Sequence, residues 1–291
     1  MEHLQHKVTL EFEYHPILSN LYEIQFAVIF GGMVLIFLLE SFWPRKNVKE
    51  DQTGRWLSNI AVALFNHFFL IFFALFLVNM TQRYLPHSPI LKAFEWSDIT
   101  KFIIVLLVME FVYYWLHRAY HKIPFLWRIH AVHHTDTEVD VTTSHRHHPF
   151  EVIVSALVIT PVVFLLGAPA ITIALYNLLN AVFTLTTHSN IKLPEKLDSV
   201  LRKFVVTPDF HRLHHASDKQ YTDSNYSGIV PWFDYLFKTA THMPYKDIPN
   251  LELGLDILRD KNENRLDAML LTPFNYTQKK DKSLKQKTVQ P

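Results

Sequence analysis

The stretch ITKFIIVLLVMEFVYYWLHRAYHKIPFLWRIHAVHH, residues 99–134, decides the fold because an apolar segment leads directly into two histidine clusters. Residues 99–116 are almost continuously apolar, and their number is close to the ~20 that cross a bilayer as a helix. The clusters HRAYH and HAVHH follow at once. Residues three or four apart lie on the same face of a helix, so each cluster can turn its imidazoles toward one ion. The stretch therefore predicts a membrane-spanning helix that ends at a metal site.

The rest of the sequence repeats the histidine pattern. Twelve of the 18 histidines lie between His117 and His215, and the later ones fall in HRHHP, THSN and HRLHH. An isolated histidine is most often a packed or surface residue, but several clusters with helical spacing favour metal binding. In HRHHP the sequence leaves open whether His145 and His147 take part beside His148.

Four apolar blocks predict an all-α fold, an integral-membrane helical bundle. Three blocks are long enough to span a bilayer, and the fourth is broken at Gly167 and Pro169, which predicts a helical hairpin. The blocks are residues 24–43, 56–80, 99–116 and 152–185. Two full crossings and a re-entrant hairpin both fit the fourth block, and a buried hairpin in a soluble core is the alternative. We expect three long spans plus the hairpin, with a histidine-rich helical cap.

Charge placement predicts the orientation of this bundle. The loop at 44–55 carries four Lys and Arg residues, whereas the loop at 81–96 carries two. Positively charged loops favour the cytoplasmic side. The first loop, the cap and the metal site are therefore expected to be cytoplasmic.

The same features divide the chain into three regions. Residues 1–98 form an N-terminal transmembrane region, and residues 99–240 form a histidine-rich catalytic region that includes the third span and the hairpin. Residues 241–291 form a C-terminal cytoplasmic segment with a basic tail. The tail at 278–287 is rich in lysine and is expected to be disordered.

Composition narrows the choice of metal. The absence of cysteine excludes thiolate zinc sites and cysteine-bound iron–sulfur clusters within this chain. A closed structural zinc site takes four ligands, so the number of clustered histidines indicates two metals. Imidazole alone does not choose among iron, copper, nickel and zinc. A metal pair with nitrogen ligands at a membrane surface fits oxygen activation by iron, where open coordination positions bind dioxygen.

Such chemistry needs electrons from another protein. The six glycines do not form a GxGxxG nucleotide-binding motif, and no cysteine is present to hold a ferredoxin cluster. We therefore expect a separate electron donor, which is a reductase, a ferredoxin or a cytochrome. The membrane is another expected partner, and no nucleic acid is expected.

The motifs HRAYH, HAVHH, HHP, HSN and HRLHH, followed by DSNYS and WFDYLF, resemble in this order the fatty acid hydroxylase superfamily of sterol desaturase-like proteins, in its bacterial form. FWPR, RWLSN and GLDILRD extend the similarity over most of the chain. The resemblance implies an integral-membrane di-iron enzyme that uses dioxygen to hydroxylate or desaturate a fatty acyl, sterol or isoprenoid lipid. It also implies a multi-pass protein of a bacterial cytoplasmic membrane.

The resemblance further implies a set of histidine ligands for two iron ions. These are His117, His121, His130, His133, His134, His148, His188, His211, His214 and His215. Members that resemble alkylglycerol monooxygenase carry glutamate where this chain has Lys122, which argues against a pterin-dependent activity on ether lipids. Some members carry a further ligand where this chain has Thr184.

Three other residues are candidates for a part in the site. Glu110 and Tyr114 share one helical face with His117, and an acid inside a membrane span is costly. Two interpretations of this face are equally well supported. It supports the metal ligands or lines a substrate channel, or it simply pairs with another helix. Asn225, in DSNYS, matches the superfamily pattern and is expected to shape the site.

The function expected from these observations is a membrane-bound di-iron lipid oxygenase, and three alternatives exist. A metal-handling or transport protein would hold its ligands near the bilayer midplane. A di-haem cytochrome needs paired histidines within facing spans, yet only His67 lies well inside one. A catalytically inactive relative that binds lipid is the third. The sequence does not specify the lipid, the choice of hydroxylation or desaturation, the electron donor or the oligomeric state.

Overall fold

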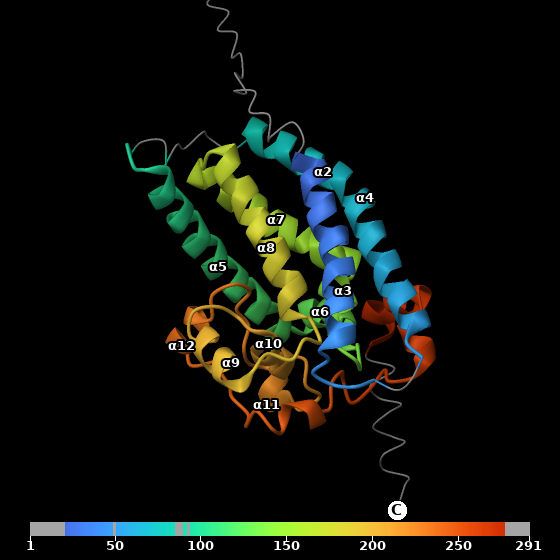
Figure 1. Cartoon of the computed structure of the whole chain (residues 1–291). Coiled ribbons are helices and arrows are strands. Elements are labelled where there is room, and N and C mark those ends of the chain that lie inside the picture. The colour runs from blue at the N-terminus through green and yellow to red at the C-terminus, as the bar shows by residue number, and fades with distance from the viewer. Residues whose placement is uncertain (1–20, 49–50, 85–89, 92–93, 277–291) are drawn as a thin grey trace, which may run out of the picture.

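The protein is built from long helices that run side by side and from short helices gathered at one end of them (Figure 1). The computed structural model describes residues 21–48, 51–84, 90–91 and 94–276, and these contain no β-strand. The predicted basic tail and part of the predicted loop at 81–96 lie outside these residues. The all-α class predicted from the sequence is confirmed for the described chain.

Four helical segments are long and apolar enough to cross a membrane. They are Glu23–Phe42, α5 (Asp98–Lys122), α7 (Pro149–Leu166) and α8 (Ala170–Thr187). The first segment combines α2 (Leu21–Phe26), a π-helical turn, η1 (Ala27–Gly31), and α3 (Gly32–Phe42). The predicted block at 56–80 lies inside one continuous helix, α4 (Thr53–Tyr84). That α4 spans the membrane stays a prediction.

The fourth apolar block forms the predicted hairpin. Gly167 ends α7 in the left-handed conformation, with φ of 59°, which a glycine adopts without steric cost. Pro169 precedes the first turn of α8 and lacks the N–H that a continuing helix would need. Each arm has 18 residues, about 27 Å of helix, which is close to the bilayer core.

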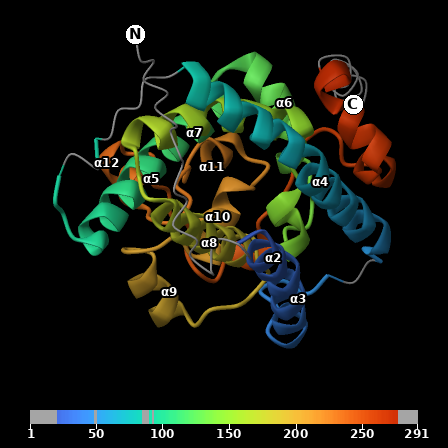
Figure 2. The ribbon, with the colours of Figure 1, turned by 90° about the horizontal axis from the view of Figure 1, so that it is seen from above.

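Helix α8 lies near the centre of the bundle when the molecule is viewed along the helices, with α5, α7, α4 and α3 around it (Figure 2). Its contacts include α5, α3 and the short helix α10 (Pro208–His214). Gly32 permits the close approach of α3, because a Cβ atom added there would lie 2.8 Å from Cδ1 of Leu185 on α8. The end of α8 therefore reaches the region where the short helices meet.

The short helices and turns form a cap at the lower end of the bundle (Figure 1). They are α6 (Pro124–His134), η2 (Val141–His145), α9 (Glu195–Leu201), α10, α11 (Lys219–Thr222), α12 (Trp232–Leu236), η3 (Ile248–Asn250) and η4 (Lys261–Asn264). Proline occupies the first turn of α6 and α10, where its missing N–H has no helical partner to lose.

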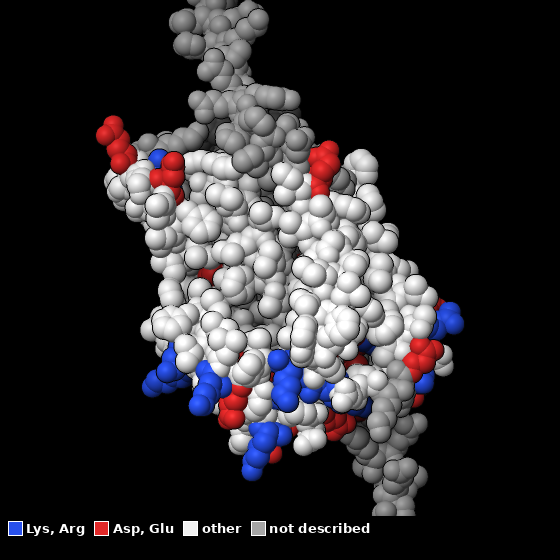
Figure 3. Space-filling model, in the orientation of Figure 1, with Lys and Arg blue, Asp and Glu red and all other residues white. Residues whose placement is uncertain are grey.

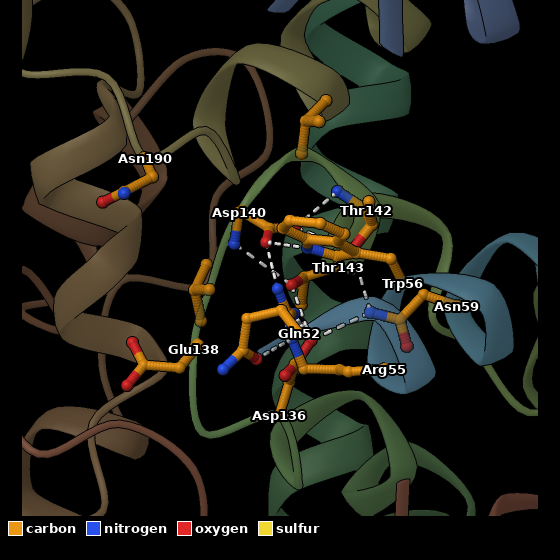
Figure 4. A network of polar contacts seen from close by, with 12 residues as sticks. Gln52, Arg55, Trp56, Asn59, Asp136, Glu138, Asp140, Thr142, Thr143 and Asn190 are labelled. Carbon is orange, nitrogen blue, oxygen red and sulfur yellow. Dashed lines mark hydrogen bonds and ion pairs between the residues drawn. The ribbon is translucent and has the colours of Figure 1, made fainter. Parts of the chain in front are cut away.

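A buried polar network joins the start of α4 to the chain that follows α6 (Figure 4). Arg55 forms ion pairs with Asp136, at 2.8 Å, and with Asp140, and Asn59 donates to Asp136 at 3.1 Å. Burial alone would raise the pKa of the Asp136 carboxyl, but Arg55 and Arg146 hold that pKa below its usual range. Removing one partner of such a pair leaves an uncompensated buried charge, so the network fixes the segment after α6 in place.

Candidate metal centre

Nine histidines converge in the cap as two groups whose ring nitrogens can each surround one ion. Within each group the candidate ligand atoms all lie within 4.8 Å of one another. The first group consists of His117, His121, His130, His134 and His214. The second group consists of His133, His188, His211 and His215.

Sequence neighbours in the HH pairs belong to different groups. His133 and His134 are adjacent on α6, yet only His134 lies in the first group. Residues four apart stay together, as His130 and His134 do, because they share a helical face. The last cluster divides in the same way, with His214 in the first group and His215 in the second. The clusters therefore do not act as separate chelates, since HAVHH and HRLHH each contribute to both groups.

Backbone carbonyls set the tautomers of two rings in the first group. The Nδ1 atom of His117 donates to the carbonyl of Tyr226 at 2.7 Å, and that of His214 donates to the carbonyl of Ser224 at 2.6 Å. A carbonyl oxygen only accepts, so in the neutral rings both Nε2 atoms present lone pairs. The Nε2 atom of His214 is buried without a hydrogen-bond partner. A metal cation bound among these nitrogens would accept their lone pairs.

The second group has the spacing of metal ligands. The Nε2 atom of His188 lies 3.1 Å from that of His133 and 3.0 Å from that of His211. Two nitrogens bound at right angles to one ion, each at ~2.0–2.1 Å, would lie about 3 Å apart. The Nδ1 atom of His188 donates to the carbonyl of Thr184 at 2.7 Å, which turns Nε2 toward its neighbours. The donor set thus fits a bound metal ion.

Burial favours the neutral form of several imidazoles in the two groups. It lowers the pKa of His188 to about 3, and it moves the pKa of His133, His134 and His214 well below the usual value. Neighbouring histidines add to the effect for these last three rings, because a second positive charge nearby is unfavourable. Neutral imidazole is the form that binds metals, so these rings are ready to act as ligands at neutral pH.

Asn225 lies between the two residues whose backbone carbonyls contact His214 and His117 of the first group. It adopts φ of 54°, and its amide nitrogen donates to the carbonyl of Phe210 at 2.8 Å. This conformation directs the carbonyls on either side of it, those of Ser224 and Tyr226, toward two histidines.

Glu151 is a buried residue that the sequence reasoning missed. Its Oε1 atom accepts from Nδ1 of His130 at 2.8 Å and from Nδ1 of His147 at 3.0 Å. These three residues form a further group of possible metal ligands, and the His147 ring stacks on His133 with centroids 4.4 Å apart. The signal was an acid in the first turn of the helix that follows HRHHP.

The structure places His148 differently from the prediction. Its Nδ1 atom accepts from the backbone N–H of Phe150 at 3.1 Å as the cap of α7, and its Nε2 atom lies 3.1 Å from the carbonyl of Leu270. Both ring nitrogens are therefore engaged away from the two groups, because the chain turns at Pro149 to start a helix. His145 is also outside the two groups.

Glu110 and Tyr114 hold the loop after the cap histidines to α5. The carboxylate of Glu110 accepts from the backbone N–H of Ile229 at 2.7 Å and from the hydroxyl of Tyr176 at 3.2 Å. The hydroxyl of Tyr114 lies 2.9 Å from that of Thr239. Both residues lie outside the histidine groups, and these contacts pair a helix with a loop, but Glu110 also lines the cavity beside the histidines.

A cavity of about 250 Å³ connects the two groups to the interior of the bundle. His117 and His130 of the first group and His133, His188 and His211 of the second line one part of it. Its other walls come from α5, α7 and α8, through residues that include Glu110, Tyr113, Tyr120, Val152 and Asn180. A chain-like molecule lying between these helices would reach both groups.

A match to the family model described as fatty acid hydroxylase covers residues 102–239, which contain all of these histidines. This part of the chain belongs to the fatty acid hydroxylase family. The superfamily resemblance drawn from the motifs is thereby confirmed.

The chain is similar to several curated relatives. It is 24% identical to human alkylglycerol monooxygenase over 213 residues, 72% of this chain and 46% of that protein. It is 24% identical to the ornithine lipid hydroxylase OlsE of Rhizobium tropici over 240 residues, 79% of this chain and 71% of that protein. It is 32% identical to the very-long-chain aldehyde decarbonylase GL1-4 of Oryza sativa subsp. indica over 139 residues, 45% of this chain and 22% of that protein.

The chain spans less than half the length of the alkylglycerol monooxygenases that it matches. No solved structure matches it significantly.

Proposed function

We propose that this chain is a membrane-bound di-iron oxygenase that hydroxylates or desaturates a C–H bond of a lipid. The observation that carries the proposal is the pair of buried histidine groups, whose nitrogens face one another and share one cavity. The first group would hold one iron ion and the second group the other. Membership of the fatty acid hydroxylase family, and the names of its lipid-oxidising relatives, support this choice.

Bound ferrous ions would supply the electrons and open coordination positions that turn dioxygen into an oxidant for an unactivated C–H bond. The protein itself orients the histidine ligands and encloses the site. The carbonyls of Thr184, Ser224 and Tyr226 and the carboxylate of Glu151 fix the tautomers and directions of four histidines. Such outer partners typically change metal affinity or activity by ~10–100-fold when they are lost.

The cavity between α5, α7 and α8 would bind the substrate. Its walls combine apolar side chains such as Leu116 and Val152 with hydroxyl and amide groups such as Tyr113 and Asn180. An acyl, sterol or isoprenoid chain in this space would bring one of its carbons to the histidines while the surrounding helices exclude water. The substrate class rests on this lining and on the lipid named in the relative OlsE.

Charge distribution supports a cytoplasmic metal site, and the relative from Rhizobium tropici supports a bacterial membrane. Lys and Arg gather at the cap end of the molecule, below a broad surface with few charged residues (Figure 3). Positively charged surfaces favour the cytoplasmic side of a membrane. We propose that a separate electron donor docks at this end, and that residues 99–240 form the catalytic region between an N-terminal transmembrane region and a C-terminal cytoplasmic segment.

A labelling experiment tests the function. Membranes containing the protein would be supplied with isotopically labelled dioxygen and an electron-donor system, and their lipids analysed by mass spectrometry. A labelled hydroxyl group, or a lipid short of two hydrogens, that depends on the protein and on dioxygen supports the proposal. Unchanged lipids together with tight zinc or copper binding would favour a metal-handling protein or an inactive relative instead.

A further inference from the structure

Two short helices of the cap present an exposed apolar surface outside the four candidate spans. One part is α9 with the turn after it, and the other is α12. We call this surface the cap patch; its residues are Leu197, Val200, Phe204, Trp232 and Leu236. Exposed fractions reach 58% for Phe204 and 67% for Leu236. Contiguous exposed apolar surface of this kind marks a site of interaction.

Hydrogen bonds fix the two parts of the cap patch to each other. The indole N–H of Trp232 donates to the carbonyl of Lys203 at 3.1 Å, and the hydroxyl of Tyr235 donates to the carbonyl of Arg202 at 2.8 Å. The segments come from positions about thirty residues apart in the sequence and yet form one rigid surface. The cap patch is therefore one ordered surface of the cap rather than two separate segments.

The cap patch continues the surface of a candidate membrane span. Phe111 and Trp115 are exposed near the end of α5. Phe111 contacts Phe233 of α12 with ring centroids 5.6 Å apart, and Trp115 contacts Phe237 with centroids 5.0 Å apart. Apolar side chains thus run from the span onto α12, which contacts α5 and lies beside its lower end in Figure 1.

Exposed lysines surround the cap patch. They are Lys192, Lys196, Lys203 and Lys238. Among residues 192–204 and 232–238, Glu195 is the exposed carboxylate, whereas Asp198 and Asp234 are buried. Apolar side chains bordered by lysine are the pattern of a surface that lies in the interface of an anionic membrane.

We infer that the cap patch is immersed in the interfacial layer of the same bilayer that holds the spans, against anionic lipid headgroups. The cap patch continues the apolar surface of α5, which favours the membrane over a soluble partner. The surrounding lysines favour anionic lipid headgroups. Gly228, which lines the cavity, lies just before Trp232 in the chain, so immersion of the patch also fixes the depth of that cavity wall. The inference is independent of the reaction that the protein catalyses.

Spin labelling tests the inference directly, because the chain has no cysteine and a single one can be labelled specifically. The test variants are Phe204→Cys and Leu236→Cys, in vesicles of phosphatidylcholine and phosphatidylglycerol. Gln220→Cys, exposed on α11 in the same cap, is the water-facing control, and Ile103→Cys, exposed on α5, is the lipid-facing control. Power saturation compares access of oxygen, which partitions into lipid, with access of a nickel chelate, which stays in water.

We expect the ratio of oxygen to nickel access to exceed one at Phe204→Cys and Leu236→Cys, as at Ile103→Cys, and to fall below one at Gln220→Cys. The ratio at the two patch positions should decrease when phosphatidylglycerol is omitted. Greater access of the nickel chelate would place the patch in water, and exclusion of both reagents would mean that protein covers it. Either result would overturn the inference, and an unchanged ratio without phosphatidylglycerol would overturn the part assigned to the lysines.

Discussion

The two histidine groups are close neighbours, but the surrounding chain orients them unequally. In the first group, His117, His130 and His214 each direct Nδ1 to a carbonyl or carboxylate. The Nδ1 atoms of His121 and His134 lack a hydrogen-bond partner, so three of the five rings in the first group are held in this way. In the second group only His188 is, because the Nδ1 atoms of His133, His211 and His215 are buried without a partner. Outer partners hold a ring in its ligating direction and raise its basicity. The first group should therefore bind its metal more tightly than the second.

Removal of one ligand from either group should have the largest effect. His133→Ala and His134→Ala change adjacent residues that belong to different groups. Each should abolish turnover and lower the iron content from about two ions per chain toward about one, since a two-metal reaction needs both. Iron analysis and lipid oxidation measure this. His242→Ala, exposed in the cap outside both groups, is the matched control, and a His134→Ala protein that kept both irons and its turnover would contradict the assignment.

A decrease in pH should destabilise both histidine groups alike, so the two groups should not differ in their response to acid. Burial lowers the pKa of His134 in the first group and of His133 and His188 in the second, the last to about 3. Unfolded histidine titrates near 6.5, so below that pH the unfolded chain binds more protons and stability falls as the pH drops toward 3. Each such histidine contributes up to about 1.4 kcal/mol per pH unit.

Thermal unfolding of the metal-free protein between pH 7.5 and pH 5 measures this loss. The unfolding temperature should decrease over that interval, and bound metal should oppose the decrease because protons compete with the ion for the same nitrogens. A metal-free protein with the same unfolding temperature at both pH values would show that these rings are not buried and neutral.

The substitution Glu151→Leu should change the iron affinity of the first group but not that of the second. The carboxylate accepts from Nδ1 of His130 in the first group, so its loss should weaken iron binding there by ~10–100-fold. The second group should keep its iron. Titration with a chelator, followed by Mössbauer spectroscopy, distinguishes the two ions. Glu138→Leu, which removes a cap carboxylate paired with Lys46 instead of a histidine, is the control. Equal loss of iron from both groups would contradict the assignment of Glu151 to the first group alone.

Gly32→Ala should disturb the second group slightly. The added Cβ would lie 2.8 Å from Cδ1 of Leu185, three residues before His188, so α3 or Leu185 must shift at a cost of about 1 kcal/mol. Gly31→Ala meets no atom within 4 Å and gains the same helix propensity. Weaker iron retention in the second group of Gly32→Ala alone is the expected result, and identical retention in both variants would contradict it.

Much of the fold follows from patterns that the sequence displays. Apolar blocks predicted the helices at 24–43 and 99–116, and Gly167 with Pro169 predicted the break of the hairpin. The observed α5 extends to Lys122, so the same helix carries the apolar segment and the HRAYH cluster. These features are local, because helix periodicity and the conformational preferences of glycine and proline act over a few residues.

The arrangement of the candidate site was less predictable. Helical spacing brings His130 and His134 together, but it does not tell which group receives His133. The carbonyl partners carry no side-chain signature, and His147 and His148 lie in a turn where spacing defines no common face. There the tertiary structure decides, and it directs His147 toward Glu151 while His148 caps a helix.

Mössbauer spectroscopy of the anaerobically purified protein, with iron counted per chain, tests the central claim most directly. The two histidine groups predict about two ferrous ions per chain, in two unequal environments because their outer partners differ. After Glu151→Leu, the signal of one environment should decrease while that of the other remains. A single iron per chain, or no iron together with full occupancy by zinc, would contradict the assignment of two iron sites to this cap.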